Sequence, residues 1–144
     1  MTICLIDDDS IYQLITTKII EMVHPLQKVI SFSNGQQALN YFTNPSPHNQ
    51  VLPDIIFLDI NMPIMNGWEF LDAYSELQSL DKKIPIYMVS SSVNEEDSLR
   101  SKNYAAVKDF IVKPMCKMRI SQILSVAVGS NTLVEQTRNA HLPN

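Results

Sequence analysis

Two kinds of hydrophobic pattern alternate along the chain. Short runs of three or four mostly apolar residues are typical of strands that are buried on both faces of a parallel sheet. Five such runs occur, at residues 3–6, 29–32, 55–58, 86–89 and 110–112. The sequence therefore predicts five short strands, spread over most of the chain.

Segments with helical periodicity lie between these runs and after the last one. From Ile11 to Met22, apolar residues recur every three or four positions, and this helix should end before Pro25. Further helices are expected at residues 38–42, 67–80 and 118–128. A polar helix should begin at Ser92–Glu95, which has the form of a capping box. Five strands alternating with five helices imply an α/β fold, in which helices cover both faces of a parallel sheet.

The length of 144 residues fits one domain. We expect residues 1–128 to form it, and residues 129–144 to be a polar, frayed or partly helical C-terminal extension with no output domain. Such an extension is too short to build a core of its own. The polar, proline-containing segment 44–50 is interpreted as a surface loop.

Composition narrows the class of function. The chain is 45% hydrophobic and 18% charged, which is enough to bury a core, and its net charge is −4. No run of basic residues is present, which argues against direct nucleic-acid binding. No apolar stretch approaches the roughly 20 residues of a membrane span. Cys4 and Cys116 match no metal-ligand spacing and are interpreted as small packing residues in a reducing cytoplasm.

Candidate chemistry gathers where the predicted strands end. Ligands of an open parallel sheet bind beyond the carboxyl ends of its strands. The first strand is followed by Asp7–Asp9, the third by Asp59, the fourth by Ser90, and the fifth by Lys113 and Pro114. An isolated aspartate at such a place is usually a turn former or a helix cap, and Asp9 or Ser10 is the expected cap of the first helix. Four polar features at one edge of a sheet are better explained by a shared site.

Clustered carboxylates require compensation. Two of them about 4 Å apart repel each other by roughly 4 kcal/mol at an effective dielectric constant near 20. Either one is protonated or a cation neutralises them, and oxygen ligands favour a hard divalent ion such as Mg²⁺. An ammonium at Lys113 and a hydroxyl at Ser90 could bind phosphoryl oxygens. Positioning and charge neutralisation are the main needs of phosphoryl transfer.

These residues stand in motifs that resemble those of the response-regulator receiver family of two-component signalling. The motifs occur in the family's order and spacing over residues 2–128, and they are Ile6-Asp7-Asp8-Asp9, Pro53 to Pro63 with Met65-Asn66-Gly67, Pro85 to Ser91, and Phe110 to Pro114. The resemblance implies a flavodoxin-like, doubly wound sheet of five parallel strands in the order 2-1-3-4-5, flanked by five helices.

The resemblance also implies a role for each matching residue. Asp59 would be the phosphoacceptor, with Mg²⁺ held by Asp8 directly, by Asp7 through water, by Asp59 and by the backbone carbonyl of Asn61. Ser90 and Lys113 would bind the phosphoryl group.

Further positions match parts of the family that respond to phosphorylation. Ser90 and Phe110 would form the switch, and the Lys113–Pro114 peptide bond would be cis. Asn61 and Ser92 would tune self-catalysed dephosphorylation. Two departures stand out: serine replaces the more frequent threonine at position 90, and Phe110 lacks a phenolic hydroxyl.

The resemblance favours a phosphorylation-controlled interaction module rather than an enzyme. The expected donor is a sensor histidine kinase or a histidine phosphotransfer protein, and the expected output is the binding of a downstream protein by a monomer or weak dimer. A phosphorylation-independent adaptor is an alternative. A haloacid-dehalogenase-like phosphatase is another, but that family requires a second aspartate where this chain has Asn61.

Overall fold

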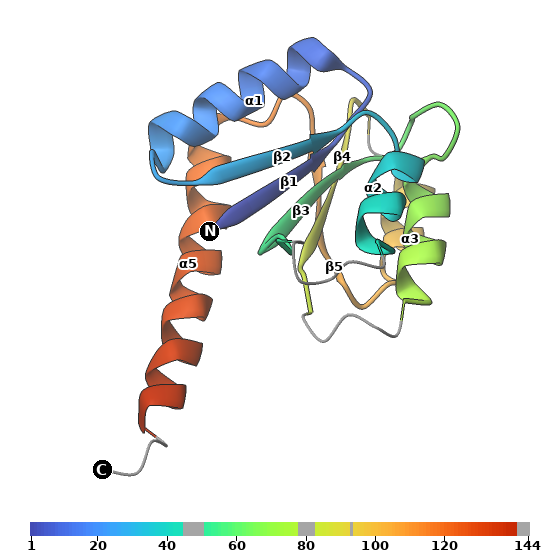
Figure 1. The fold of residues 1–144 in the computed structure, drawn as a ribbon. Helices are drawn as coiled ribbons and strands as arrows, with labels where there is room; N and C mark the ends of the chain where they lie inside the picture. Colours follow the sequence, from blue (N-terminus) through green and yellow to red (C-terminus); the bar gives the residue numbers. More distant parts are fainter. Residues whose placement is uncertain (45–50, 78–82, 93, 141–144) are drawn as a thin grey trace.

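A computed structural model describes residues 1–44, 51–77, 83–92 and 94–140 of the chain. Its centre is a parallel sheet of five strands in the order β2-β1-β3-β4-β5 (Figure 1). The strands are β1 (Thr2–Ile6), β2 (Lys28–Phe32), β3 (Ile55–Asp59), β4 (Ile86–Ser90) and β5 (Val107–Val112). This topology confirms the predicted fold class.

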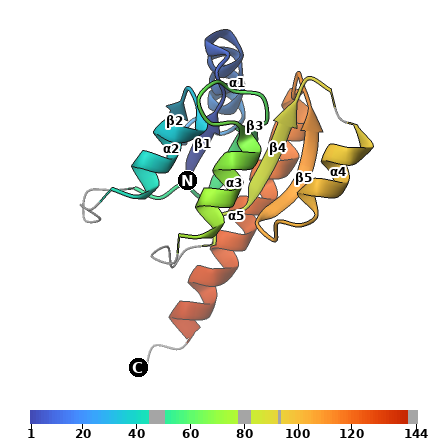
Figure 2. The same cartoon turned by 90° about the vertical axis from the view of Figure 1, so that its right-hand side faces the viewer.

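Helices cover both faces of the sheet, α1 and α5 on one face and α2, α3 and α4 on the other (Figures 1 and 2). The helices are α1 (Ser10–Val23), α2 (Gly35–Phe42), α3 (Gly67–Ser75), α4 (Glu95–Ser101) and α5 (Lys117–Ala140). No helix in the described part of the chain is long and apolar enough to cross a membrane.

Two hydrophobic clusters, one on each side of the sheet, form the core. All residues of the central strands β1 and β3 are buried, whereas the outer strands β2 and β5 are partly exposed. Phe70 of α3 is fully buried and lies next to the rings of Phe42 and Tyr74. Burial on both faces explains why the central strands have uniformly apolar sequences.

The extents of two helices differ from the sequence prediction. Helix α3 ends at Ser75, where Glu76 caps it, instead of continuing to residue 80; residues 78–82 lie outside the described part. Helix α5 continues past residue 128 and through Gly129 to Ala140. The predicted end of this helix at residue 128 is therefore wrong, whereas a partly helical extension from residue 129 was expected. Residues 45–50 of the predicted surface loop also lie outside the described part.

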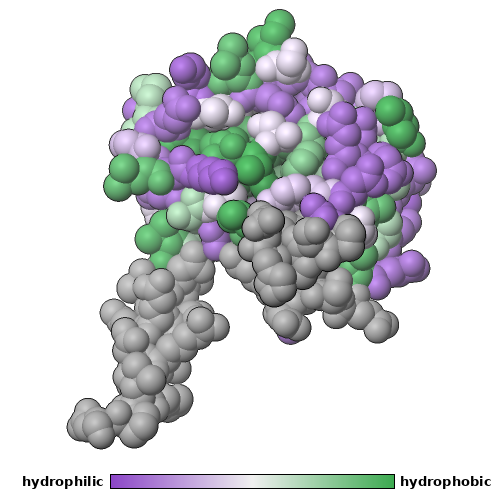
Figure 3. Space-filling model, in the orientation of Figure 1, coloured by the Kyte–Doolittle hydropathy of each residue, from purple (hydrophilic) through white to green (hydrophobic). Residues whose placement is uncertain are grey.

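Helix α1 turns a different side to the sheet from the one that its apolar stripe suggests. Thr16 and Ile20 are its buried residues. Several residues of the stripe are exposed instead, namely Ile11, Leu14, Ile15 and Met22. Figure 3 shows hydrophobic side chains at the upper edge of the molecule, where α1 lies. The periodicity predicted the helix correctly, but the helix has an apolar outer surface as well as a buried face.

Two smaller predictions also need correction. Asn94 caps α4 by accepting a hydrogen bond from the Asp97 backbone N–H at 2.7 Å, so the helix does not begin with Ser92 as its cap. Of the two free cysteines, Cys4 is buried as expected, but Cys116 is exposed and does not pack in the core.

Candidate functional site

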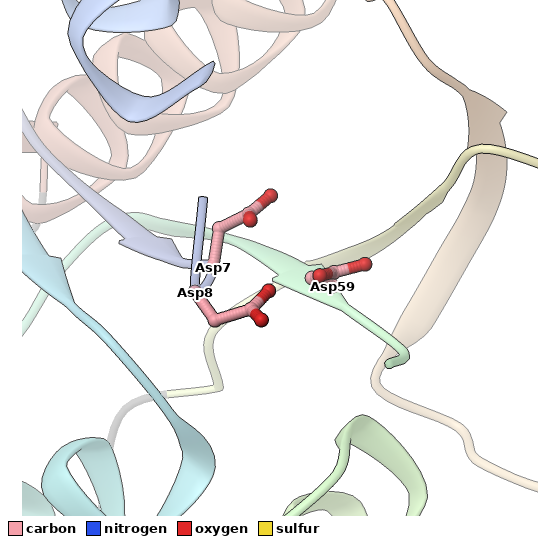
Figure 4. A group of neighbouring side chains, drawn as sticks. All are labelled: Asp7, Asp8 and Asp59. Carbon is pink, nitrogen blue, oxygen red and sulfur yellow. The ribbon is translucent and has the colours of Figure 1, made fainter. Parts of the chain in front are cut away.

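Three carboxylates meet at the carboxyl end of the sheet. β1 and β3 are neighbours, with Ile6 paired to Leu58, so the residues that come next, Asp7 and Asp59, emerge side by side. Asp8 completes the group, and one carboxylate oxygen from each of the three lies within 4.8 Å of the others (Figure 4). The prediction that side chains at the ends of the strands lie close together is confirmed for Asp7, Asp8 and Asp59.

The ammonium of Lys113 reaches the same place from the end of β5. Its Nζ lies 2.7 Å from Asp7 Oδ2 and 3.6 Å from Asp59 Oδ2. Burial alone would lower the pKa of Lys113, but the hydrogen bond and charge of Asp7, together with the charge of Asp59, raise it above its ordinary value. Lys113 is therefore a permanent cation within the acidic group. The peptide bond that follows it, Lys113–Pro114, is cis, as the resemblance implies.

The surroundings of Asp59 raise the pKa of its carboxyl group. It is only 5% exposed, and this burial raises its pKa to about 6. The negative charge of Asp7 adds to the shift, while Lys113 opposes it. A carboxylate held in such a place is charged at neutral pH but poorly solvated, so it gains from any nearby cation.

The beginning of α1 holds Asp7 in place through contacts that the sequence did not indicate. Asp9 caps the helix by accepting hydrogen bonds from the N–H groups of Ile11 and Tyr12, so Asp9 and not Ser10 is the cap. Its own N–H donates to Asp7 Oδ1 at 2.9 Å. The Gln13 side-chain amide donates to the carbonyls of Asp7 and Phe32 at 2.7 and 2.8 Å, which joins the ends of β1 and β2.

The other predicted residues lie around this centre at different depths. Ser90 ends β4 and is buried, and its hydroxyl accepts a hydrogen bond from the Ser92 N–H at 3.4 Å. Asn61 is exposed in the loop after β3. Phe110 is half-buried opposite Met88 of β4 and packs against the core below α4.

The loop from β3 to α3 is tightly folded beside Asp59. Gly67 donates its N–H to the Ile60 carbonyl at 2.8 Å, and Met65 donates to the Pro63 carbonyl at 2.7 Å. The second bond spans only two residues and places Ile64 at a φ of 70°. In the described part of the chain, Ile64 is the one non-glycine residue with positive φ, and its side chain is 81% exposed. A β-branched residue in this backbone region is strained.

We expect Ile64→Asn to raise the free energy of unfolding by about 1 kcal/mol, because asparagine tolerates positive φ and little buried area is lost. Leu26→Asn is the matched control, since Leu26 is 95% exposed and has no positive φ. The control should change stability by less than about 0.5 kcal/mol. Chemical denaturation measures both variants, and a loss of stability in Ile64→Asn would contradict the strain.

The donor set fits a hard divalent cation. The ligand atoms in reach are all oxygens, and three carboxylates against one ammonium leave an excess of negative charge. Metal ions that prefer oxygen ligands would neutralise this negative charge, and they need no nitrogen or sulfur ligand. Asp7, Asp8 and Asp59 are therefore the residues that could hold a metal ion.

Comparison with known proteins gives consistent results. The model of the response regulator receiver domain family matches residues 3–125. The chemotaxis protein CheY of Bacillus subtilis is 29% identical over 121 residues, which cover 84% of this chain and 92% of that protein. A protein-glutamate methylesterase/protein-glutamine glutaminase of Geobacillus kaustophilus is 36% identical over 94 residues. The match covers 63% of this chain but 24% of that enzyme.

Solved structures agree with the family match. A two-component response regulator from Cytophaga hutchinsonii superimposes with a TM-score of 0.77 at 29% identity, over 89% of this chain and 96% of that one. One from Legionella pneumophila, at 22% identity, shares the fold with a TM-score of 0.79, over 90% of this chain and 98% of that one. Several curated relatives are longer, and the matched region spans 24% to 40% of their length. The chain belongs to the family of response regulator receiver domains, the signalling domains of two-component systems.

Proposed function

We propose that this chain is a phosphorylation-controlled switch in which Asp59 accepts a phosphoryl group from a phosphohistidine. The observation that supports this most is the arrangement around Asp59: a buried carboxylate beside two others, with an ammonium 3.6 Å away. In this proposal residues 1–128 are the receiver domain and residues 129–144 are its C-terminal extension.

The proposed reaction is a direct transfer. A carboxylate oxygen of Asp59 attacks the phosphorus atom, the P–N bond to the donor imidazole breaks, and the electron pair stays with the imidazole nitrogen. The product is an acyl phosphate on Asp59. Lys113 is near enough to move from Asp7 toward the new phosphoryl oxygens, because its Nζ already lies between the two carboxylates.

Mg²⁺ is the cofactor that we propose, held by Asp8, Asp59 and the Asn61 carbonyl, with Asp7 acting through water. Bound there, it would neutralise charge that builds up on the transferred group. Ser90 would donate its hydroxyl hydrogen to a phosphoryl oxygen. Asn61 and Ser92 would set the rate at which the acyl phosphate is hydrolysed.

The proposed output surface consists of α4, β5 and α5. Ser90 precedes α4 in the chain, so a movement of its hydroxyl toward a phosphate would pull on this segment, and the Phe110 ring would turn inward. In α4, the guanidinium carbon of Arg100 lies 4.6 Å from the centroid of the Trp68 ring of α3. Trp68 also stacks on Tyr104, whose hydroxyl donates to Asp72 at 2.6 Å. These contacts link α4 to α3. A displacement of α4 would therefore change the surroundings of the Trp68 ring.

A protein donor and a protein target are the proposed partners, namely a sensor histidine kinase or histidine phosphotransfer protein and a downstream protein. The exposed apolar side chains of Ile11, Leu14 and Ile15 lie just beyond the helix cap that contacts Asp7. Exposed apolar patches of this kind commonly contact proteins. We place the chain in the cytoplasm, as a monomer or weak dimer without direct contact with nucleic acid or membrane.

The test is phosphorylation by acetyl phosphate, followed by intact mass and by the fluorescence of Trp68, the chain's single tryptophan. Wild type should gain one phosphoryl mass in Mg²⁺ but none in EDTA, and its fluorescence should change. Asp59→Asn should show neither effect. Asp109→Asn is the matched control, since Asp109 is exposed and pairs with Arg119 on the output side.

Three other results would redirect the interpretation. Equal phosphorylation of wild type and Asp59→Asn would contradict the proposal. Phosphorylation at Asp59 without any change in partner binding would favour the phosphorylation-independent adaptor. Steady turnover of generic phosphate esters would favour a phosphatase of the haloacid-dehalogenase type, although Asn61 replaces the second aspartate of that family.

A further inference from the structure

Tyr12 contacts the cation of the acidic group and has no role in the scheme above. It lies in the first turn of α1, and its ring centroid is 4.4 Å from Lys113 Nζ. An ammonium over an aromatic face is attracted by the negative charge of the π-system, more strongly where water is excluded. Lys113 is 17% exposed, so its ammonium is largely withdrawn from water.

The ring of Tyr12 is held by the same helix cap that positions Asp7. The Tyr12 backbone N–H donates to Asp9 Oδ1 at 3.0 Å, and the Asp9 N–H donates to Asp7 Oδ1 at 2.9 Å. Tyr12 and Asp7 are therefore fixed to one another through Asp9. The ammonium of Lys113, which arrives from β5, meets a carboxylate and an aromatic face whose relative positions are already set.

The hydroxyl of Tyr12 contributes little to this arrangement. It is buried, and no hydrogen-bond partner within proper distance and angle is found among the described residues, although Thr16 and the Met115 backbone are near. A cavity of about 10 Å³ lies beside the ring, lined in part by Asp7, Asp59 and Met115. A space of that size has room for one water at most. The ring face is the part of Tyr12 over which the ammonium of Lys113 lies.

We propose that Tyr12 is a positioning residue for Lys113, whose aromatic face keeps the ammonium between Asp7 and Asp59. Without the ring, the lysine side chain has more conformations available, and fewer of them place the ammonium within reach of Asp59. Fewer productive conformations mean slower phosphorylation. This inference rests on the proposed function for its kinetic consequence, but the position of Lys113 can be tested independently of it.

The position is tested first, by NMR of the metal-free protein. A ring current from Tyr12 should shift the ε-methylene protons of Lys113 upfield in wild type and in Tyr12→Phe. The shift should disappear in Tyr12→Leu, which keeps an apolar side chain at that site. Thermal unfolding checks that both proteins are folded. Identical Lys113 signals in folded wild type and folded Tyr12→Leu would overturn the proposal.

The kinetic test uses acetyl phosphate and Mg²⁺. Tyr12→Leu should be phosphorylated about fivefold more slowly than wild type, whereas Tyr12→Phe should stay within about twofold. In a Lys113→Met background, Tyr12→Leu should cause no further slowing, because the ring acts through the ammonium. Equal slowing in both backgrounds, or equal slowing by the leucine and phenylalanine variants, would contradict the role. Absence of phosphorylation in wild type would count against the proposed function, while the NMR comparison would still decide the position of Lys113.

Discussion

Gly67→Ala is expected to destabilise the protein by about 2–4 kcal/mol and to displace the backbone of Asp59, the proposed phosphoacceptor. A Cβ at position 67 would lie 2.5 Å from the Asp59 carbonyl oxygen and 3.0 Å from Ile60 Cα. Both atoms belong to the backbone at the end of a fully buried strand, so they cannot turn aside as a flexible side chain does. Relief of the clash requires either the start of α3 or the end of β3 to move.

Gly129→Ala is the matched control, because nothing lies within 4 Å of a Cβ at that position in α5. Alanine should stabilise this helix by up to about 1 kcal/mol relative to glycine. Urea denaturation gives both free energies of unfolding, and the rate of phosphorylation by acetyl phosphate reports the effect on the site. We expect Gly67→Ala, and not Gly129→Ala, to lower both the free energy of unfolding and the rate of phosphorylation. Equal stability of the two variants would contradict the close packing of α3 against β3.

Asp59→Asn is expected to make the metal-free protein more stable at neutral pH, by roughly 1–2 kcal/mol after allowance for solvent screening. Burial raises the pKa of Asp59 to about 6, above the value of about 3.9 in an unfolded chain. Between these two values the unfolded state loses the proton while the folded state retains it. The stability of wild type therefore falls as pH rises through this range, and asparagine avoids the loss because it carries no charge.

The measurement is chemical denaturation of wild type and Asp59→Asn in EDTA at about pH 4.5 and about pH 7.5. The advantage of the variant should be small at the lower pH and larger at the higher one. Addition of Mg²⁺ at neutral pH should stabilise wild type more than the variant, since a cation compensates the charge that asparagine lacks. A constant difference at both pH values would contradict the perturbed pKa of Asp59.

The central strands and the acidic group could be predicted from the sequence for the same reason. Strands buried on both faces must be apolar along their whole length, so β1 and β3 stand out, and the aspartates that follow each strand are easily placed. Parallel strands end at one edge of the sheet, which brings Asp7 and Asp59 together without knowledge of side-chain positions.

The contacts that support the site could not be predicted in this way. Gln13 reaches the carbonyls of Asp7 and Phe32 because β1 and β2 are neighbours in the sheet. Tyr12 reaches Lys113, a residue about 100 positions away, because β1 and β5 end at the same edge of the parallel sheet. The buried face of α1 could not be predicted either, because the most apolar stripe of this helix lies at the surface while Thr16 is buried. Hydrophobic periodicity identifies a helix more securely than it identifies the side that is buried.

Identification of the residue that carries the phosphoryl group is the most direct test of Asp59 as the phosphoacceptor. After reaction with acetyl phosphate and Mg²⁺, borohydride reduces an aspartyl phosphate to homoserine, which peptide mass spectrometry can locate. We expect homoserine at position 59 alone, in wild type treated with Mg²⁺, and none after treatment in EDTA. A modified residue elsewhere, or full modification of Asp59 in EDTA, would contradict the proposed site.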